Sequence, residues 1–278
     1  MLNAMSVDVE DYFQVSAFEP YIAREDWESW PQRVVENTER ILELFESFSV
    51  KATFFTLGWI AERHPSLVRE IVAKGHELAC HGYAHVRVDR QSPQEFRQDI
   101  SRAKGVLEDI AGVKVKGYRA PSYSINQTCP WAWSVLQETG FKYSSSIYPV
   151  RHDLYGWPEA PRFPFHPKAA PDLLEIPITT VRLLGRNFPC GGGGYFRLYP
   201  FGLSRWALRR VNGEGKPCVF YFHPWEIDLK QPRPKGLGVK TRVRHYLNLH
   251  RMEGRLLALL REFSWDTIQN VFLSQDAD

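Results

Sequence analysis

The sequence lacks several features that would assign a function directly. No two of its four cysteines form a C-x-x-C pair, which excludes cysteine-rich zinc sites and thioredoxin-type chemistry. No segment holds 18 or more consecutive apolar residues, so no membrane-spanning helix is predicted. The N-terminus, MLNAMSVDVEDYF, has neither the basic start nor the apolar stretch of a secretory signal. We therefore expect a cytoplasmic protein with free, mostly buried thiols.

Signals for nucleotide and nucleic-acid binding are also missing. No G-x-G-x-x-G follows the first predicted strand, and the glycine run 191–194 is not followed by the G-K-[ST] of a phosphate-binding loop. The net charge of +3 is too small to indicate a nucleic-acid partner. One basic stretch, residues 230–251, is interpreted as a solvated loop and helix face. Its alternative is peripheral contact with an anionic polymer, lipid headgroup or membrane surface.

Strand-like and helix-like segments alternate through the first half of the chain. Short apolar strands are predicted at 2–9, 52–57, 77–80 and 117–119. Helices are predicted from Pro31, over 60–73, over 92–110 with Ser92 and Glu95 in a capping box, and over 131–138. This order predicts parallel strands joined by helices, in a barrel or a doubly wound sheet.

The second half has weaker patterns. Residues 149–171 are rich in proline and aromatics and predict an ordered loop over one end of the fold. Strands are predicted at 173–181, 218–222 and 266–272, and helices at 203–211 and 242–263. Without an internal repeat or a linker, we expect one domain, since barrels of about 250 residues are common.

Polar residues follow the predicted strands. In parallel α/β barrels the carboxyl ends of the strands share one face, which carries the chemistry. We therefore expect residues that are distant in sequence to converge there. They are Asp8, Glu10 and Asp11 after the first strand, His81 and His85 after the third, Arg119 after the fourth and His223 after a late strand.

The segment HGYAH indicates a metal site. His81 and His85 are four residues apart, a spacing that places two rings on one side of a helical turn. Alone, the pair could arise by chance, and the three acids of SVDVED would equally suit a helix cap. Together they favour a His₂-carboxylate site with open positions for water and substrate. A second carboxylate nearby can act as general base.

Three further features each have a structural and a functional interpretation. His223 either ends a strand or protonates a leaving amine. Arg119, in GYRAPSY, either pairs with an acid or orients a catalytic carboxylate, and the two roles are compatible. The glycines at 191–194 either form a flexible turn or bring backbone N–H groups close to a substrate.

In this order, the segments resemble the NodB-type polysaccharide deacetylases, carbohydrate esterase family 4, over roughly residues 2–225. The matching motifs are Asp8-Val9-Glu10-Asp11, His81 to His85, Arg119-Ala120-Pro121 and Tyr221-Phe222-His223. The match is closer still to a subgroup linked to exopolysaccharide loci, at VDVEDYF, HGYAH, YRAPSYSI, GGGGYFRLYP and FYFHPWEID.

The resemblance implies an α/β fold, a distorted (β/α)₇ barrel in a single domain, 1–278, with a C-terminal helical extension at about 226–278. It also implies a divalent metal, usually Zn²⁺. The implied reaction removes N-acetyl groups from N-acetylhexosamine units. The implied partner is an N-acetylated polysaccharide or its lipid- or nucleotide-linked precursor, in exopolysaccharide biosynthesis.

The resemblance also implies roles for individual residues. Asp8 is expected to be the base and His223 the acid, with Arg119 tuning Asp8. His81 and His85 are expected to hold the metal with Glu10, or with Asp11 as the second choice, because here the usual adjacent acids are separated. The expected substrate-binding residues are Tyr123, Gly193, Gly194, Tyr195 and Trp225. The chain departs from the family again at Ser144, where relatives often have Asp.

Two alternatives remain at this point. One is hydrolysis of a small amide, imide or O-acetyl ester on the same fold. The other is a non-catalytic saccharide-binding module, against which the combination of a base, an acid and metal ligands argues. The aromatic content of 14% favours a sugar substrate over a small amide.

Overall fold

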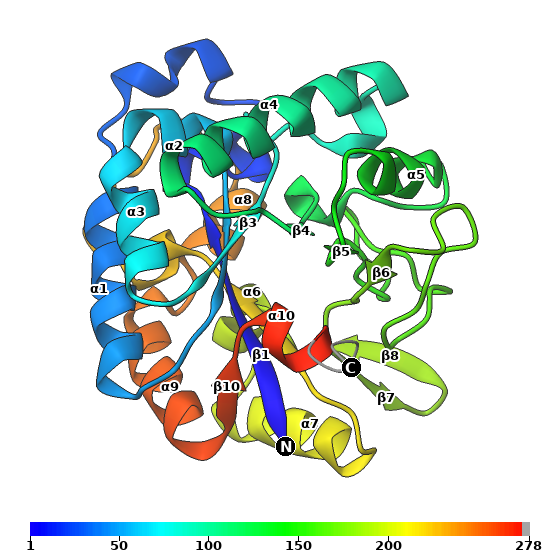
Figure 1. Cartoon of the computed structure of the whole chain (residues 1–278). Helices are drawn as coiled ribbons and strands as arrows, with labels where there is room; N and C mark the ends of the chain where they lie inside the picture. The colour runs from blue at the N-terminus through cyan, green and yellow to red at the C-terminus, as the bar shows by residue number, and fades with distance from the viewer. Residues whose placement is uncertain (274–278) are drawn as a thin grey trace.

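Parallel strands form one curled sheet at the centre of the computed structural model, which describes residues 1–273 (Figure 1). The strand order is β10-β1-β2-β3-β4-β5-β6. Strand β9 lies outside this order and also pairs with β1. The bounds are β1 (Leu2–Val9), β2 (Thr53–Thr56), β3 (Glu77–Cys80), β4 (Gly117–Tyr118), β5 (Tyr143–Ser144), β6 (Leu174–Glu175), β9 (Val219–Phe222) and β10 (Ser264–Asp266). This half-barrel confirms the predicted α/β barrel in a single domain with C-terminal helices.

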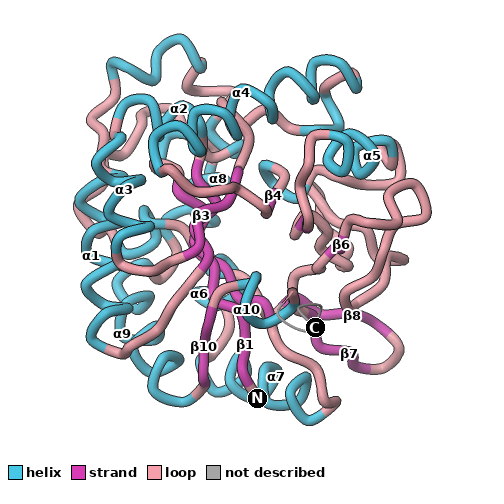
Figure 2. The backbone as a smooth tube through the Cα atoms, in the orientation of Figure 1, coloured by secondary structure: helices cyan, strands magenta, loops and turns pink. Residues whose placement is uncertain are grey.

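Helices surround the sheet, with α1, α3 and α9 along one side of the view in Figure 1 and α4 and α5 above the far strands. Their bounds are α1 (Val34–Ser47), α2 (Gly58–Arg63), α3 (Pro65–Ala73), α4 (Pro93–Ala111), α5 (Trp131–Glu138), α6 (Gly193–Leu198), α7 (Phe201–Gly213), α8 (Val239–Tyr246), α9 (Leu249–Glu262) and α10 (Ile268–Phe272). Figure 2 shows that loops dominate the side near β6 and the antiparallel hairpin of β7 (Thr180–Leu183) and β8 (Arg186–Pro189). Among the described residues, no helix has the length and apolar character needed to cross a membrane.

Strand β1 shows how the sequence positions the site. Side chains alternate across a strand, so Met5, Val7 and Val9 pack outward into the core beneath the helices. Ser6 and Asp8 point into the barrel, where both contact Arg119. The alternation therefore delivers a carboxylate to the inside of the barrel at the carboxyl end of its central strand.

Several predicted elements have the bounds that the sequence indicated. Strands β1 and β3 and helix α5 begin and end as predicted. Helix α4 begins after Ser92, whose side chain and that of Glu95 form the predicted capping box. All four cysteines are free and buried, as expected.

Other predictions were wrong in their details. The helix predicted over 60–73 is interrupted at His64, because Pro65 disfavours a helical residue before it. The helix predicted over 242–263 is two helices, since Asn248 adopts a left-handed backbone with φ of 53°. The strand predicted over 266–272 ends at Asp266, and Thr267 then caps α10.

The region around 173–193 also differs from the prediction. The strand predicted over 173–181 is two short strands, β6 and β7, that belong to different sheets. The glycine run is not simply a flexible turn, because helix α6 begins at Gly193. Strands β5 and β8 had no prediction, since each is too short to show a periodic pattern.

Candidate active site

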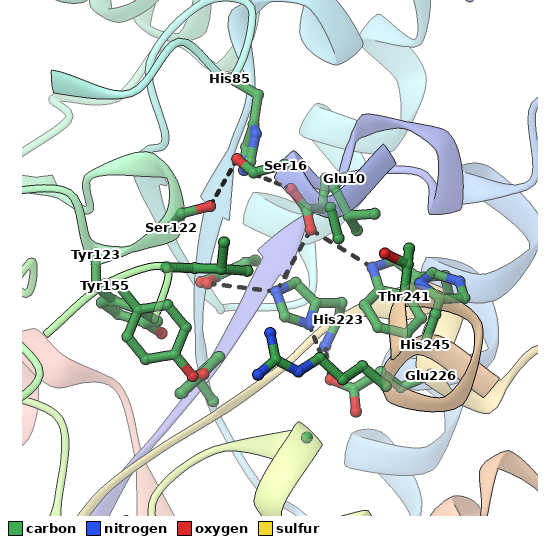
Figure 3. Close-up of a pocket in the computed structure, with 18 of the residues that line it drawn as sticks. Glu10, Ser16, His85, Ser122, Tyr123, Tyr155, His223, Glu226, Thr241 and His245 are labelled. Atoms are coloured by element: carbon green, nitrogen blue, oxygen red, sulfur yellow. Dashed lines mark hydrogen bonds and ion pairs between the residues drawn. The ribbon is translucent and has the colours of Figure 1, made fainter. Parts of the chain in front are cut away.

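A hollow of about 180 Å³ lies at the carboxyl ends of the parallel strands. This is smaller than a typical site of about 300–1,000 Å³ for a drug-sized ligand, so it suits a small group. Figure 3 shows Glu10, His85 and His223 pointing into it from three separate segments. Residues predicted for the site that line it are Asp8, Glu10, His81, His85, Tyr123, Gly194, His223 and Trp225.

Glu10, His81 and His85 form the one group of possible metal ligands within residues 1–273. Each is buried, and one ligand atom from each lies within 4.8 Å of the others. Glu10 Oε2 is 2.8 Å from His85 Nε2. His81 Nδ1 is 2.8 Å from the carbonyl oxygen of Arg119, which fixes the ring and leaves Nε2 for a ligand.

The charge states of these groups suit a cation. Burial opposes ionisation of Glu10, but the neighbouring His85, His223 and His81 lower its pKa to about 2. Burial lowers the pKa of His81 to about 4, so this imidazole is neutral at pH 7. Metal ligation requires an ionised carboxylate and a neutral imidazole, and these pKa values favour that state for Glu10 and His81.

The other candidate ligand, Asp11, lies elsewhere. Its Oδ1 accepts a hydrogen bond from the Tyr12 amide at 2.9 Å, and its Oδ2 accepts from the amides of Arg33 at 2.6 Å and Val34 at 2.9 Å. Burial raises the pKa of Asp11 to about 6. The structure thus brings Glu10 to the histidines and uses Asp11 to join the end of β1 to the start of α1.

Asp8 lies beside Arg119, which is fully buried. An Arg119 terminal nitrogen donates to Asp8 Oδ1 at 2.6 Å and to Ser6 Oγ at 2.9 Å. Arg119 also donates to the carbonyl oxygen of Ser145 at 3.1 Å. Asp8 Oδ1 is therefore held in place, while Oδ2 faces the hollow, 3.9 Å from His223 Nε2.

His223 follows β9 and contacts three carboxylates. Its Nε2 is 3.4 Å from Glu10 Oε1, and its Nδ1 is 2.8 Å from Glu226 Oε1. The His223 amide also donates to Glu226 Oε1, at 3.1 Å. Burial favours the neutral ring, but Glu10, Glu226 and Asp8 outweigh it and raise the pKa of His223 to about 9.

Glu226 and Arg197 were not predicted. Glu226 is fully buried and accepts from Arg197 Nε at 2.7 Å. Arg197 also donates to the carbonyl oxygens of His245 at 2.9 Å and Leu247 at 2.7 Å. Glu226 could have been found, since it lies three residues after His223 at capping-box spacing. Arg197 gave no local signal, because its partners are 29 and about 50 residues away.

The predicted substrate-binding residues divide into two groups. Tyr123 and Gly194 line the hollow, whereas Gly193 and Tyr195 do not. The Tyr123 amide donates to the carbonyl oxygen of Ala120 at 3.0 Å, so this N–H already has an acceptor. A side chain on Gly193 would overlap the Glu226 carboxylate, so a glycine at this position leaves the space that the carboxylate occupies.

Trp225 lines the hollow but shows little free surface. Its ring stacks on His223, with centroids 5.1 Å apart, and on His245, with centroids 4.1 Å apart, and Trp225 is 6% exposed. The structure therefore places Trp225 behind the proton-carrying histidine, where it supports that ring.

Further residues that line the hollow had no predicted role. Ser16 and Ser122 face each other across its mouth, with their Oγ atoms 2.8 Å apart (Figure 3). Tyr155 and Tyr221 complete an aromatic wall with Tyr123. They come from loops and from the inner face of β9, and isolated serines and tyrosines carry no motif.

Two family models match adjacent segments of the chain, and residues 1–26, which include Asp8 and Glu10, precede both. Residues 27–144 match the model of the polysaccharide deacetylase family. Residues 145–273 match a domain of unknown function, DUF3473. The boundary falls at the end of β5, so the metal-ligand candidates His81 and His85 lie in the first segment and His223 lies in the second.

Curated relatives are similar over part of the chain. A bifunctional xylanase/deacetylase from Pseudobutyrivibrio xylanivorans is 36% identical over 92 residues, which are 33% of this chain and 15% of that protein. A peptidoglycan-N-acetylglucosamine deacetylase from Bacillus cereus is 36% identical over 87 residues, which are 31% of this chain and 32% of that protein. The chain spans a third or less of the length of these two relatives.

Solved structures share the fold over nearly the whole chain. A protein assigned as a polysaccharide deacetylase from Mycobacterium smegmatis superposes with a TM-score of 0.60 at 22% identity, over 95% of this chain and 85% of that one. A peptidoglycan N-acetylglucosamine deacetylase superposes with a TM-score of 0.52 at 17% identity, over 98% and 88%. These likenesses show that the chain shares the fold of both structures. The match to the polysaccharide deacetylase family covers residues 27–144, and the two curated relatives are similar to this chain over about a third of its length.

Proposed function

We propose that this protein is a metal-dependent hydrolase that removes N-acetyl groups from N-acetylhexosamine units of a polysaccharide or its precursor. One observation carries the proposal. A possible metal-ligand triad, an arginine-held aspartate and a carboxylate-paired histidine all face one hollow. A saccharide-binding module has no need for this combination.

The proposed metal ligands are Glu10, His81 and His85. The donor set fits a divalent ion, because one carboxylate and two imidazoles leave positions open, and Zn²⁺ is the ion we propose. His85 Nδ1 has no hydrogen-bond partner although it is buried, and the His85 backbone is left-handed with φ of 52°. Such strain is commonly kept at functional positions. When bound, the ion polarises the acetamide carbonyl and lowers the pKa of a water molecule.

Asp8 is the proposed general base. Because Arg119 occupies Oδ1, Oδ2 is the atom available to accept a proton from the attacking water. Arg119 is fully buried and has fixed partners, so the carboxylate stays in one orientation without reorganisation during the reaction. This assignment makes Arg119 a positioning residue for Asp8.

His223 is the proposed general acid. Its pKa of about 9 means that the ring carries a proton at neutral pH. Glu226 accepts from Nδ1, which directs Nε2 into the hollow, where it can donate a proton to the departing sugar nitrogen. Ser144 Oγ donates a hydrogen bond to Ser146 Oγ. The carboxylate that accepts from His223 Nδ1 in this protein belongs to Glu226.

We propose that residues 1–278 form a single deacetylase domain, since residues from both matched segments and from the region before residue 27 line the same hollow. The native substrate we propose is an N-acetylated exopolysaccharide or its carrier-linked precursor. The resemblance of VDVEDYF, HGYAH and FYFHPWEID to proteins of exopolysaccharide loci supports this part of the proposal.

The test is acetate release from N-acetylglucosamine oligomers by the purified protein as isolated, after chelation, and after zinc is added back. The variant Asp8→Asn removes the proposed general base, and the variant His81→Ala removes a proposed metal ligand. We expect the native protein to release acetate, chelation to abolish this release, and added zinc to restore it. Neither variant should release acetate.

Two results would redirect the proposal. Acetate release only from O-acetylated xylan, or hydrolysis only of a small cyclic imide, would assign another acyl substrate to the same site. Saccharide binding that chelation does not affect, without turnover in the zinc-loaded protein, would indicate a binding module.

A further inference from the structure

A second, larger hollow lies next to the candidate active site. This cleft of about 1000 Å³ runs between the loop 149–163 and the hairpin of β7 and β8. Four arginines line it, namely Arg151, Arg162, Arg182 and Arg186. Glu159 is the one acidic residue among those that line it, and it accepts a hydrogen bond from Gln127.

Three of these arginines have no acidic partner within the described chain. Arg151, Arg182 and Arg186 make no ion pair within residues 1–273 and are exposed. Arg162 is held by Glu214 at 3.1 Å and by the carbonyl oxygen of Thr180 at 2.7 Å. The cleft therefore concentrates positive charge that residues 1–273 do not neutralise.

The basic stretch 230–251 is different. Lys240 and Arg244 in helix α8 both pair with Asp153, at 2.5 and 2.8 Å. These two charges hold the tip of the 149–163 loop against α8, and Arg244 also lines the active-site hollow. Two charges of that stretch are thus used inside the fold, whereas Arg151, Arg182 and Arg186 of the cleft have no ion pair within residues 1–273.

One pair of stacked rings separates the cleft from the active site. His152 lines the cleft and Tyr155 lines the active-site hollow, and their ring centroids are 3.9 Å apart with planes 13° from parallel. Figure 3 shows Tyr155 beside Tyr123 at the edge of the site. The hollow and the cleft are therefore neighbours, one pair of stacked rings apart.

We propose that this cleft is a subsite for an anionic group of the substrate, a carboxylate or a phosphate. Arginine suits both, because its planar fork donates two parallel hydrogen bonds to either group. This inference rests on the proposed deacetylation and narrows its substrate class. The anion has two possible sources, acidic sugars of the polymer or the diphosphate of a carrier-linked precursor.

The experiment measures dissociation constants on the chelated protein, in which no acetyl group is removed. The ligands are an N-acetylglucosamine tetramer, an equally long oligomer that alternates N-acetylglucosamine with glucuronic acid, and a nucleoside diphosphate N-acetylglucosamine. The proteins are the native chain, Arg151→Gln/Arg182→Gln, and Arg69→Gln. Arg69 is an exposed arginine of α3 that lines neither hollow.

We expect an anionic ligand to bind about fivefold more tightly than the neutral tetramer, because each exposed ion pair is weak. The double variant should lose this preference, Arg69→Gln should keep it, and 1 M salt should remove it. Preference for the glucuronate oligomer assigns the anion to the polymer, and preference for the diphosphate sugar assigns it to the precursor.

Equal affinity for neutral and anionic ligands in the native chain would overturn the subsite. So would a double variant that weakens all three ligands by the same factor. These binding results do not depend on turnover. A protein that prefers the anionic ligand but releases no acetate once zinc is restored would overturn the deacetylase assignment and leave the subsite standing.

Discussion

Two parts of this chain, residues 1–144 and residues 145–273, build their sides of the active site by different means. In residues 1–144, regular strands place the functional groups, because Asp8, Glu10 and His81 lie at or directly after the ends of β1 and β3. In residues 145–273, buried hydrogen bonds place them, through the Arg197–Glu226–His223 series. The first side depends on the sheet and the second on one buried ion pair, so they should fail differently when altered.

Loss of the metal is the largest effect that we expect, and only changes within residues 1–144 should cause it. Glu10→Gln should weaken zinc binding by more than about a hundredfold, since even residues that only orient a ligand contribute 10–100-fold. Asp11→Asn should keep zinc but lose about 1 kcal/mol of stability, because Asp11 caps the start of α1. Mass spectrometry of bound zinc and thermal unfolding separate the two. Zinc lost from a folded Asp11→Asn protein would contradict the ligand assignment.

Removal of the Glu226 charge should affect the second side without affecting the metal. We expect Glu226→Gln to lower kcat by about 10–100-fold, a fraction of what a proton donor contributes. The native kcat should fall as the pH rises through about 9, where His223 loses its proton. In Glu226→Gln the fall in kcat should begin at lower pH, because one of the carboxylates that raise the pKa of His223 is gone. In Glu226→Asp the fall should begin closer to the native pH. A purely structural role would lower the melting temperature and leave the alkaline limit in place.

Two neighbouring glycines test the packing of that buried pair. A side chain at position 193 would overlap the Glu226 carboxylate, whereas nothing lies within 4 Å of one at position 194. Gly193→Ala should therefore cost about 1–3 kcal/mol, as overpacking does, and lower Tm by roughly 5 °C. Gly194→Ala should leave Tm unchanged. Equal melting temperatures for the two variants would show that Glu226 moves aside at no cost.

The smallest expected effect is a dependence of stability on pH in the first segment. His76 accepts a hydrogen bond from the Ala52 amide, and burial lowers its pKa to about 4. The unfolded chain binds this proton below pH 6.5 and the folded chain does not, so stability falls as the pH falls from 6.5 towards 4. Between pH 7 and 5.5 the loss should be about 1 kcal/mol. Urea unfolding of His76→Gln should show a smaller loss, and an identical pH dependence would exclude His76 as its cause.

The sequence predicted the first segment better than the second for a physical reason. Strands β1 and β3 and the capping box of α4 are local patterns, and parallel topology alone brings their ends together. Which of Glu10 and Asp11 faces the histidines depends on contacts with α1, more than 20 residues away. Arg197 and Glu226 meet only through the fold, and the short strands around β6 to β8 show no periodicity. Such features could not be predicted from one sequence.

The placement of β1 has a consequence for the order in which the protein is made. This strand lies between β2 and β9, and it also pairs with β10. A ribosome makes β1 before its partner strands, and one edge of β1 has no partner among the described strands until residues 219–222 have emerged. Pairings this distant in sequence form slowly, and an exposed strand edge is prone to aggregation. We therefore expect the nascent chain to need protection during synthesis, and the groups around Asp8 to assemble only after β9 (Val219–Phe222) has emerged.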